Sequence, residues 1–170
     1  MHARKMVRKG FTLVEILIVV VILGILAAIV IPQFTNASTA AKASSVLSQL
    51  QTLRSQVELY KNQHNNEYPT SDGTLTGTWT WTKMTNKTDI DGVEGTTAGE
   101  HIYGPYMQQA PKNPFVTSTG NANTALGTAV DGSVGWVINT TTGVIRAAVP
   151  TAISNEQNMD DVNDVVEFGS

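Results

Sequence analysis

The pattern of hydrophobic positions changes twice along this chain. From Phe11 to Ile31 the side chains are almost all apolar, and Glu15 is the one charged residue among them. From residue 33 to residue 65 apolar side chains recur every three or four positions, with no glycine or proline, which predicts an amphipathic helix. Beyond residue 66 short apolar runs alternate with turn residues. The pattern therefore predicts one long N-terminal helix followed by a region of strands and loops.

The amphipathic part of this helix has a single apolar stripe. Its members are Val46, Leu47, Leu50, Leu53, Val57 and Tyr60. The repeat spans barely two heptads, so a sheet packed on the stripe is favoured over a coiled coil.

The last 104 residues have a strand-and-loop composition, with five of the six prolines and twelve of the fourteen glycines. Alternation at residues 79–82 predicts a strand, and residues 134–138 and 144–149 predict a hairpin. Residues 86–100 and 117–133 are expected to be loops. The predicted fold is α+β, with a long helix packed on a small antiparallel sheet.

Charge and length identify the N-terminal region as a membrane segment. The 21-residue apolar run would form a helix of ~31 Å, close to the ~30 Å of a bilayer's hydrocarbon core. Residues 1–10 carry four basic side chains (Arg4, Lys5, Arg8 and Lys9) and no acid, which predicts a cytoplasmic N-terminus and an exported remainder. Pro32 closes the run.

Three interpretations of the run compete. A cleaved secretory signal is disfavoured because the run is too long and its best cleavage site, at residues 35–37, is poor. An ordinary single-pass anchor explains the length but not the carboxylate of Glu15. A carboxylate in a membrane is costly and usually has a partner, which makes Glu15 a candidate functional residue.

The residues around Glu15 carry a resemblance. Lys9-Gly10-Phe11-Thr12-Leu13-Val14-Glu15, after a short basic leader, resembles the signature of type IV prepilins, which type II secretion pseudopilins share. The resemblance implies that a prepilin peptidase cuts between Gly10 and Phe11 and methylates the new amine of Phe11. It implies a leader at 1–10, a transmembrane and assembly helix at 11–31, an amphipathic continuation at 32–65 and a head at 66–170.

The same resemblance implies roles in assembly. Glu15 would pair with the Phe11 amine of a neighbouring subunit, and such a pair would fix the stagger between subunits. Thr12, Leu13 and Pro32 are the other expected assembly positions.

Looser matches are similar to the major pseudopilin of type II secretion, the protein G-like class. They are residues 58–61, 68–70, 106–107, 110–115 and 135–145. This likeness implies a bacterial inner-membrane subunit with a periplasmic head and a filament that is periplasmic or extracellular. Its implied partners are copies of itself, the prepilin peptidase, minor pseudopilins and an inner-membrane assembly platform.

That class carries a calcium site in its C-terminal loops. Here Asp160, Asp161, Asn163 and Asp164 are oxygen ligands of the right type, but their spacing is not that of an EF-hand. A solvated acidic tail explains them more simply, so no metal ligand and no cofactor is predicted.

Composition excludes several other functions. The chain has no cysteine, which excludes thiol catalysis and disulfides. His64, expected at the polar end of the helix, and His101, expected in a loop, lack metal-site spacing, and no enzyme motif is present. Residues 11–170 carry a net charge of −7, which disfavours nucleic acid as a partner. A type IV pilus pilin and an unprocessed membrane-tethered binding domain remain as alternatives.

Overall fold

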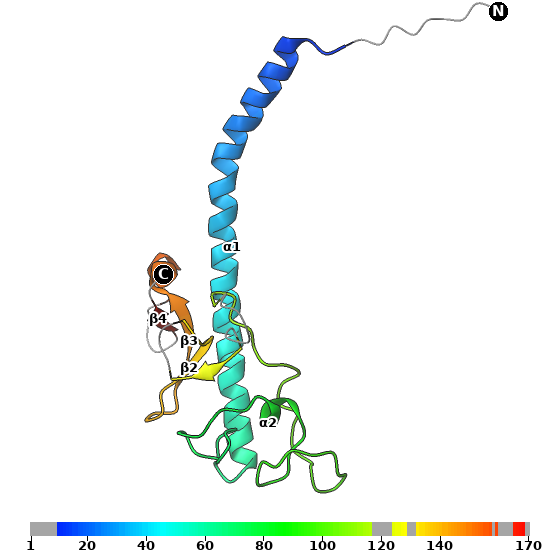
Figure 1. Ribbon diagram of the computed structural model, residues 1–170, viewed down its shortest axis with the longest axis vertical. Helices are drawn as coiled ribbons and strands as arrows, with labels where there is room; N and C mark the ends of the chain where they lie inside the picture. Colours follow the sequence, from blue (N-terminus) through cyan, green and yellow to red (C-terminus); the bar gives the residue numbers. More distant parts are fainter. Residues whose placement is uncertain (1–9, 117–123, 129–131, 158, 160–164, 169–170) are drawn as a thin grey trace, which may run out of the picture. The chain divides into compact units, whose positions relative to one another are not determined.

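The computed structural model describes residues 10–116, 124–128, 132–157, 159 and 165–168 (Figure 1). The chain divides into two compact units, residues 1–39 and 40–170. The described secondary structure comprises three helices, α1 (Leu13–Gln63), α2 (Thr82–Thr85) and α3 (Thr151–Gln157), and four strands, β1 (Leu126–Gly127), β2 (Trp136–Ile138), β3 (Ile145–Pro150) and β4 (Val165–Phe168). The predicted long helix is confirmed in α1.

Helix α1 ends where two asparagines enter the left-handed region. Asn65 has φ 52° and Asn66 has φ 66°. The Asn66 amide donates to the Lys61 carbonyl at 2.8 Å, so one of the last carbonyls of the helix keeps a partner. Asparagine tolerates this conformation and takes the place that glycine often occupies.

The four strands form one sheet in the order β1-β2-β3-β4. The predicted hairpin is confirmed: β2 and β3 are antiparallel, with Trp136 opposite Ala147. The expectation of a purely antiparallel sheet is wrong, because β1 is parallel to β2 and β4 is parallel to β3. Helix α3 follows β3 and returns the chain so that β4 runs in the same direction as β3, the usual geometry of a helical crossover.

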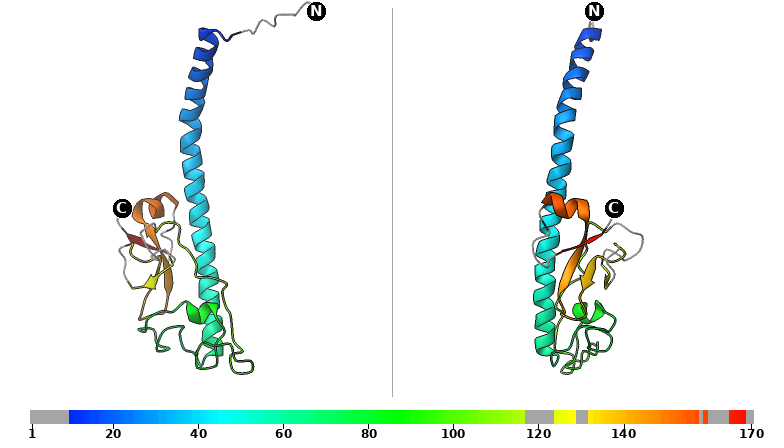
Figure 2. Two further views of the ribbon diagram at one scale, coloured as in Figure 1. Left: turned by 45° about the vertical axis from the view of Figure 1, so that its right-hand side comes forward. Right: turned by 90° about the vertical axis from the view of Figure 1, so that its left-hand side faces the viewer.

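The core lies between the sheet and the C-terminal half of α1, and both views in Figure 2 show the sheet on one side of that half. The stripe predicted from the sequence provides the helix side of this core, where Val46 and Leu53 are fully buried. Trp136 of β2 is also fully buried, and its indole N–H donates to the Pro111 carbonyl at 3.0 Å. The stripe is therefore a packing surface for the sheet.

A buried asparagine connects the segment before β1 to the hairpin. The Asn113 amide nitrogen donates to the Gly135 carbonyl at 2.7 Å and to the Ala148 carbonyl at 2.6 Å. Its carbonyl oxygen accepts the Phe115 amide at 3.0 Å. All three bonds are buried or partly buried, so Asn113 satisfies backbone groups that would otherwise lack partners.

The prediction of a strand at residues 79–82 is wrong. Trp79 forms a single antiparallel bridge with Thr70, and the chain then turns into α2 at Thr82. The Trp81 indole donates to the Thr124 carbonyl at 2.7 Å, and Met84 is fully buried in the core. These tertiary contacts outweigh the local alternation on which the strand prediction rested.

His64 is fully buried, not at the polar end of the helix as expected. Its ring stacks on Tyr60 with centroids 3.8 Å apart. One ring nitrogen lies 2.8 Å from the Tyr60 carbonyl and the other 2.9 Å from the Thr88 hydroxyl. The imidazole therefore links the last turn of α1 to the loop that contains Thr88.

Two tyrosines beside His64 are expected to make the head sensitive to alkali. Burial raises the pKa of Tyr106 to about 12, and burial together with Tyr106 and nearby carboxylates raises the pKa of Tyr60 above the ordinary range. Both hydroxyls thus stay neutral in the folded chain at a pH where they ionise in the unfolded one. Their contribution to stability is complete below about pH 10 and is lost as the pH rises toward 12.

We therefore expect the urea midpoint of the full-length chain in detergent to fall steadily above about pH 10. Tyr106→Phe should flatten this dependence, because the phenyl ring cannot ionise, although the variant loses the 2.6 Å bond from the Tyr106 hydroxyl to Gln63. An unchanged pH dependence in the variant would show that Tyr106 is not one of the groups responsible.

Candidate assembly and processing site

The proposed cleavage site precedes α1. Gly10 is exposed, and no atom lies within 4 Å of the position that a Cβ would occupy there. Phe11 is 83% exposed. Packing within the described chain therefore does not require glycine at position 10. Only a protein that binds this segment could require it.

Thr12 and Glu15 form a reciprocal cap at the start of α1. The Thr12 amide and hydroxyl donate to Glu15 Oε2 at 2.8 Å and 2.9 Å, and the Glu15 amide donates to the Thr12 hydroxyl at 3.2 Å. This is a capping box, which satisfies two of the orphan amides at a helix start. Negative charge is also favourable at that end of the helix dipole.

Sequence reasoning treated Glu15 only as a partner for another subunit and missed this second role. The signal was present, because Thr-x-x-Glu before an apolar run is the pattern of a capping box. Among the described residues, every hydrogen bond to the Glu15 carboxylate reaches Oε2. No described residue donates a hydrogen bond to Oε1.

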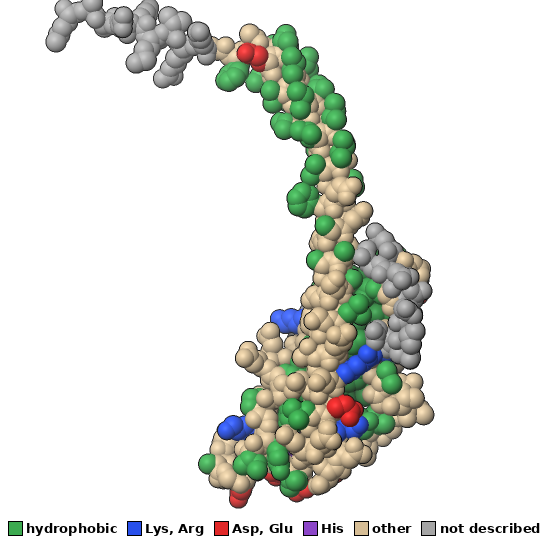
Figure 3. Space-filling model, turned by 180° about the vertical axis from the view of Figure 1, so that it is seen from behind, with side chains coloured by type: hydrophobic (Ala, Val, Ile, Leu, Met, Phe, Trp, Pro, Cys, Tyr) green, Lys and Arg blue, Asp and Glu red, His purple; other side chains and the backbone are tan. Residues whose placement is uncertain are grey.

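The surface of α1 beyond Glu15 is apolar on all sides. Leu13, the first residue of the helix, is 82% exposed, and each large apolar side chain from Leu13 to Phe34 is exposed. Figure 3 shows these side chains covering the N-terminal part of the helix. Helix α1 is long and apolar enough to cross a membrane. A surface of this kind is unstable in water and must be covered by lipid or by protein.

Pro32 lies inside α1, which continues past it without a break in the assigned helix. A proline has no amide hydrogen, so one carbonyl in the preceding turn loses its intrahelical donor. Nearby, the Thr35 hydroxyl donates to the Ile31 carbonyl at 3.2 Å and the Thr39 hydroxyl to the Thr35 carbonyl at 3.1 Å. These threonines give further hydrogen bonds to backbone carbonyls of the turns around and after Pro32.

The structure brings together only part of the predicted set. Gly10, Phe11, Thr12, Leu13 and Glu15 are adjacent at the start of α1, whereas Pro32 lies 17 residues beyond Glu15. In the described part of the chain, no three His, Asp or Glu side chains are grouped so that they could hold a metal. Asp160, Asp161, Asn163 and Asp164 lie outside the described residues.

Comparisons with known proteins agree with the motif. Residues 5–31 match the family model of the prokaryotic N-terminal methylation motif. The chain is 39% identical over 69 residues to the type II secretion system core protein G of Klebsiella michiganensis, which covers 41% of this chain and 48% of the relative. It is 40% identical over 65 residues to the protein of the same name from Dickeya chrysanthemi, which covers 38% of this chain and 42% of the relative.

A second kind of relative is also found. The chain is 48% identical over 54 residues to the type IV major fimbrial protein FimA of Dichelobacter nodosus, which covers 32% of this chain and 35% of the relative. The matched segments span less than half the length of these curated relatives. No solved structure matches the chain. The methylation motif and these relatives show that the N-terminal part of the chain is similar to type IV pilins and type II secretion pseudopilins.

Proposed function

We propose that this protein is a structural subunit of a pilus-like filament, the major pseudopilin of a type II secretion system. The observation that supports this most is the apolar surface of α1, which is exposed from Leu13 to Phe34 and begins at the Thr12–Glu15 cap. Such a helix lies in lipid before assembly and against copies of itself afterwards. The relatives named core protein G support the same assignment.

Before assembly the subunit crosses the bacterial inner membrane once. The four basic residues of the leader stay in the cytoplasm, and the head lies in the periplasm. The prepilin peptidase then cuts after Gly10 and methylates Phe11. This cut removes the basic leader and leaves an amine close to the capped carboxylate of Glu15.

Assembly then uses the carboxylate atom that the cap leaves available. The Phe11 amine of one subunit bonds Glu15 Oε1 of its neighbour, while Oε2 continues to cap α1. In an apolar filament core this ion pair is favourable only when both charges meet, so other staggers are disfavoured. Minor pseudopilins and an inner-membrane platform would start and drive the polymerisation.

A type IV pilus pilin is the second candidate. The 48% identity to the fimbrial protein FimA supports it, although that match is the shorter one. The absence of cysteine favours the pseudopilin, because many major pilins close a C-terminal loop with a disulfide.

Deletion of the gene in its native host, with complementation, tests the two candidates. For a pseudopilin, we expect exported proteins to accumulate in the periplasm while surface pili remain normal. Loss of surface pili with normal protein secretion would instead support the type IV pilin. A strain that loses neither secretion nor pili would contradict both.

A further inference from the structure

Residues 86–103 form a compact loop that is fixed on the end of α1. Thr88 bridges to both Glu94 and Tyr103 in antiparallel fashion. The Thr88 amide donates to the Tyr103 carbonyl at 3.0 Å, and the Tyr103 amide returns a bond of 3.1 Å. The Thr88 hydroxyl meets the buried His64 ring, so this side of the loop faces inward.

Three apolar side chains of the loop are exposed. Antiparallel pairing at Thr88 places Val93 and Ile102 on either side of Asp89, whose amide donates to the Val93 carbonyl at 3.0 Å. Val93 is 57% exposed, Ile102 62% and the adjacent Ile90 46%. We call Ile90, Val93 and Ile102 the loop face.

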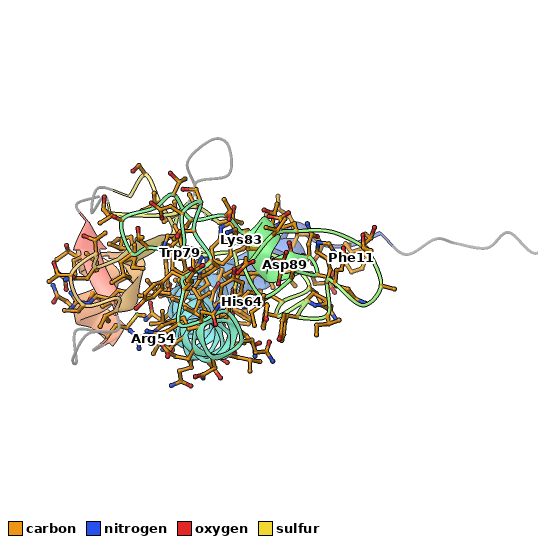
Figure 4. All side chains as sticks on the ribbon, turned by 90° about the horizontal axis from the view of Figure 1, so that it is seen from below. Phe11, Arg54, His64, Trp79, Lys83 and Asp89 are labelled. Atoms are coloured by element: carbon orange, nitrogen blue, oxygen red, sulfur yellow. The ribbon has the colours of Figure 1, made fainter. Side chains whose placement is uncertain are left out.

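The turn that carries the loop face lies against Tyr60. Gly92 has φ 73°, and a Cβ there would collide with the Tyr60 hydroxyl and lie 3.4 Å from Lys83 Nζ, so the turn is seated on Tyr60. Figure 4 labels Asp89, Lys83 and His64 in a view from below. Among the described residues beyond α1, the loop face provides all of the exposed large hydrophobic side chains. A fixed apolar surface of this kind is typical of an interface.

Acidic side chains neighbour the loop face along the chain. Asp91, Glu94 and Glu100 are exposed, and Lys87 is the one exposed base within residues 86–103. A partner should therefore combine a basic rim with a surface that an apolar loop can approach closely.

The head itself carries a surface of that kind. Residues 40–57 contain no acid, and the exposed side chains of α1 there are small apart from Lys42 and Gln51. Lys112 is also exposed and lies beside this part of α1, because its backbone amide donates to Gln49 Oε1 at 3.2 Å. The side-chain amide of Gln49 in turn donates to the Ser45 hydroxyl. Small side chains allow a partner to approach the helix closely. We call the exposed residues of this surface the basic face: Ala41, Lys42, Ser44, Ser45 and Lys112.

We propose that the loop face of one copy of this chain binds the basic face of a second copy. The two faces are different surfaces of the same head, so the contact is heterologous and repeats without closing, as a filament requires. This inference rests on the proposed function. It adds a contact between heads to the one between N-terminal helices.

Cysteine cross-linking tests the contact in the full chain within its own assembly system, because the chain has no native cysteine. Each copy carries Ser44→Cys and Ile102→Cys, and filaments are oxidised with copper–phenanthroline. A disulfide between residues 44 and 102 of the same copy is excluded. The loop packs on the C-terminal end of α1, and residue 44 lies about 30 Å from that end along the helix. The control pair is Ser44→Cys with Thr141→Cys, which places the second thiol on the exposed hairpin turn.

We expect a ladder of disulfide-linked oligomers from the first pair and none from the control. Normal filaments without a ladder, or with an equal ladder from the control, would overturn the proposed contact while leaving the filament itself intact. If wild-type chains form no filament, the proposed function fails, and the head contact fails with it.

Charge-reversal variants test the same contact if the cysteine variant does not assemble. Lys42→Glu with Lys112→Glu, and separately Asp91→Lys with Glu100→Lys, should each lower the assembled fraction by about tenfold, because like charges then meet. Both pairs together should restore assembly. Failure of the combined variant to assemble better than either pair would overturn the contact.

Discussion

Replacing Glu15 by valine is expected to leave processing intact and to abolish filament assembly. Valine suits the apolar helix surface, so membrane insertion and cleavage after Gly10 should proceed. The Phe11 amine of each neighbouring subunit would then be buried without a counter-charge, a loss of about 3–5 kcal/mol per contact. Sheared filaments counted by electron microscopy, beside the processed and unprocessed forms on a gel, measure both effects.

The matched variant Glu15→Gln separates the cap from the charge. Glutamine is the other residue that serves in a capping box, so the start of α1 stays capped while the negative charge is removed. We expect Glu15→Gln to assemble nearly as poorly as Glu15→Val. Normal filaments from Glu15→Gln would show that Glu15 acts only as a helix cap and would disprove the pairing with Phe11.

Replacing Gly10 by valine is expected to stop maturation. The structure provides open space at Gly10, so the substitution should not disturb α1 or the head. A β-branched side chain would, however, keep a peptidase from approaching the backbone at the scissile bond. The precursor should accumulate in the membrane with residues 1–10 attached, and filaments should be absent.

Gly24→Val is the control for this prediction, because Gly24 also has no atom within 4 Å of its would-be Cβ. It lies inside α1, away from the cleavage site, and its variant should be processed like the wild type. Full maturation of Gly10→Val, measured by the mass of the membrane-bound chain, would place the cleavage site elsewhere.

Local patterns were the most informative part of the sequence. The three-to-four periodicity from Val46 to Tyr60 predicts the buried side of α1 because the side chains of one helix face are fixed by local geometry. The hairpin of β2 and β3 is similarly local, since its two strands are joined by a short turn. Thr12 and Glu15 also form a local pattern, the capping box, although the sequence analysis assigned Glu15 only a role in pairing between subunits.

The remainder depends on contacts between distant residues. β1 is two residues long and lies inside a segment expected to be a loop, so only its pairing with β2 defines it. The burial of His64 depends on Thr88 and Tyr103, which lie far along the chain. The turn into α2 replaces a strand because Met84 enters the core. No local signal distinguishes these outcomes from their alternatives.

The intact mass and N-terminal peptide of the protein, isolated from its native membrane, test the central claim most directly. Under the proposed function, the leader must be removed before Phe11 can present an amine to Glu15 of a neighbour. We expect a chain that begins at N-methylated Phe11. A mature chain that retains residues 1–10 would contradict it and would indicate a membrane-tethered domain that does not polymerise by this route.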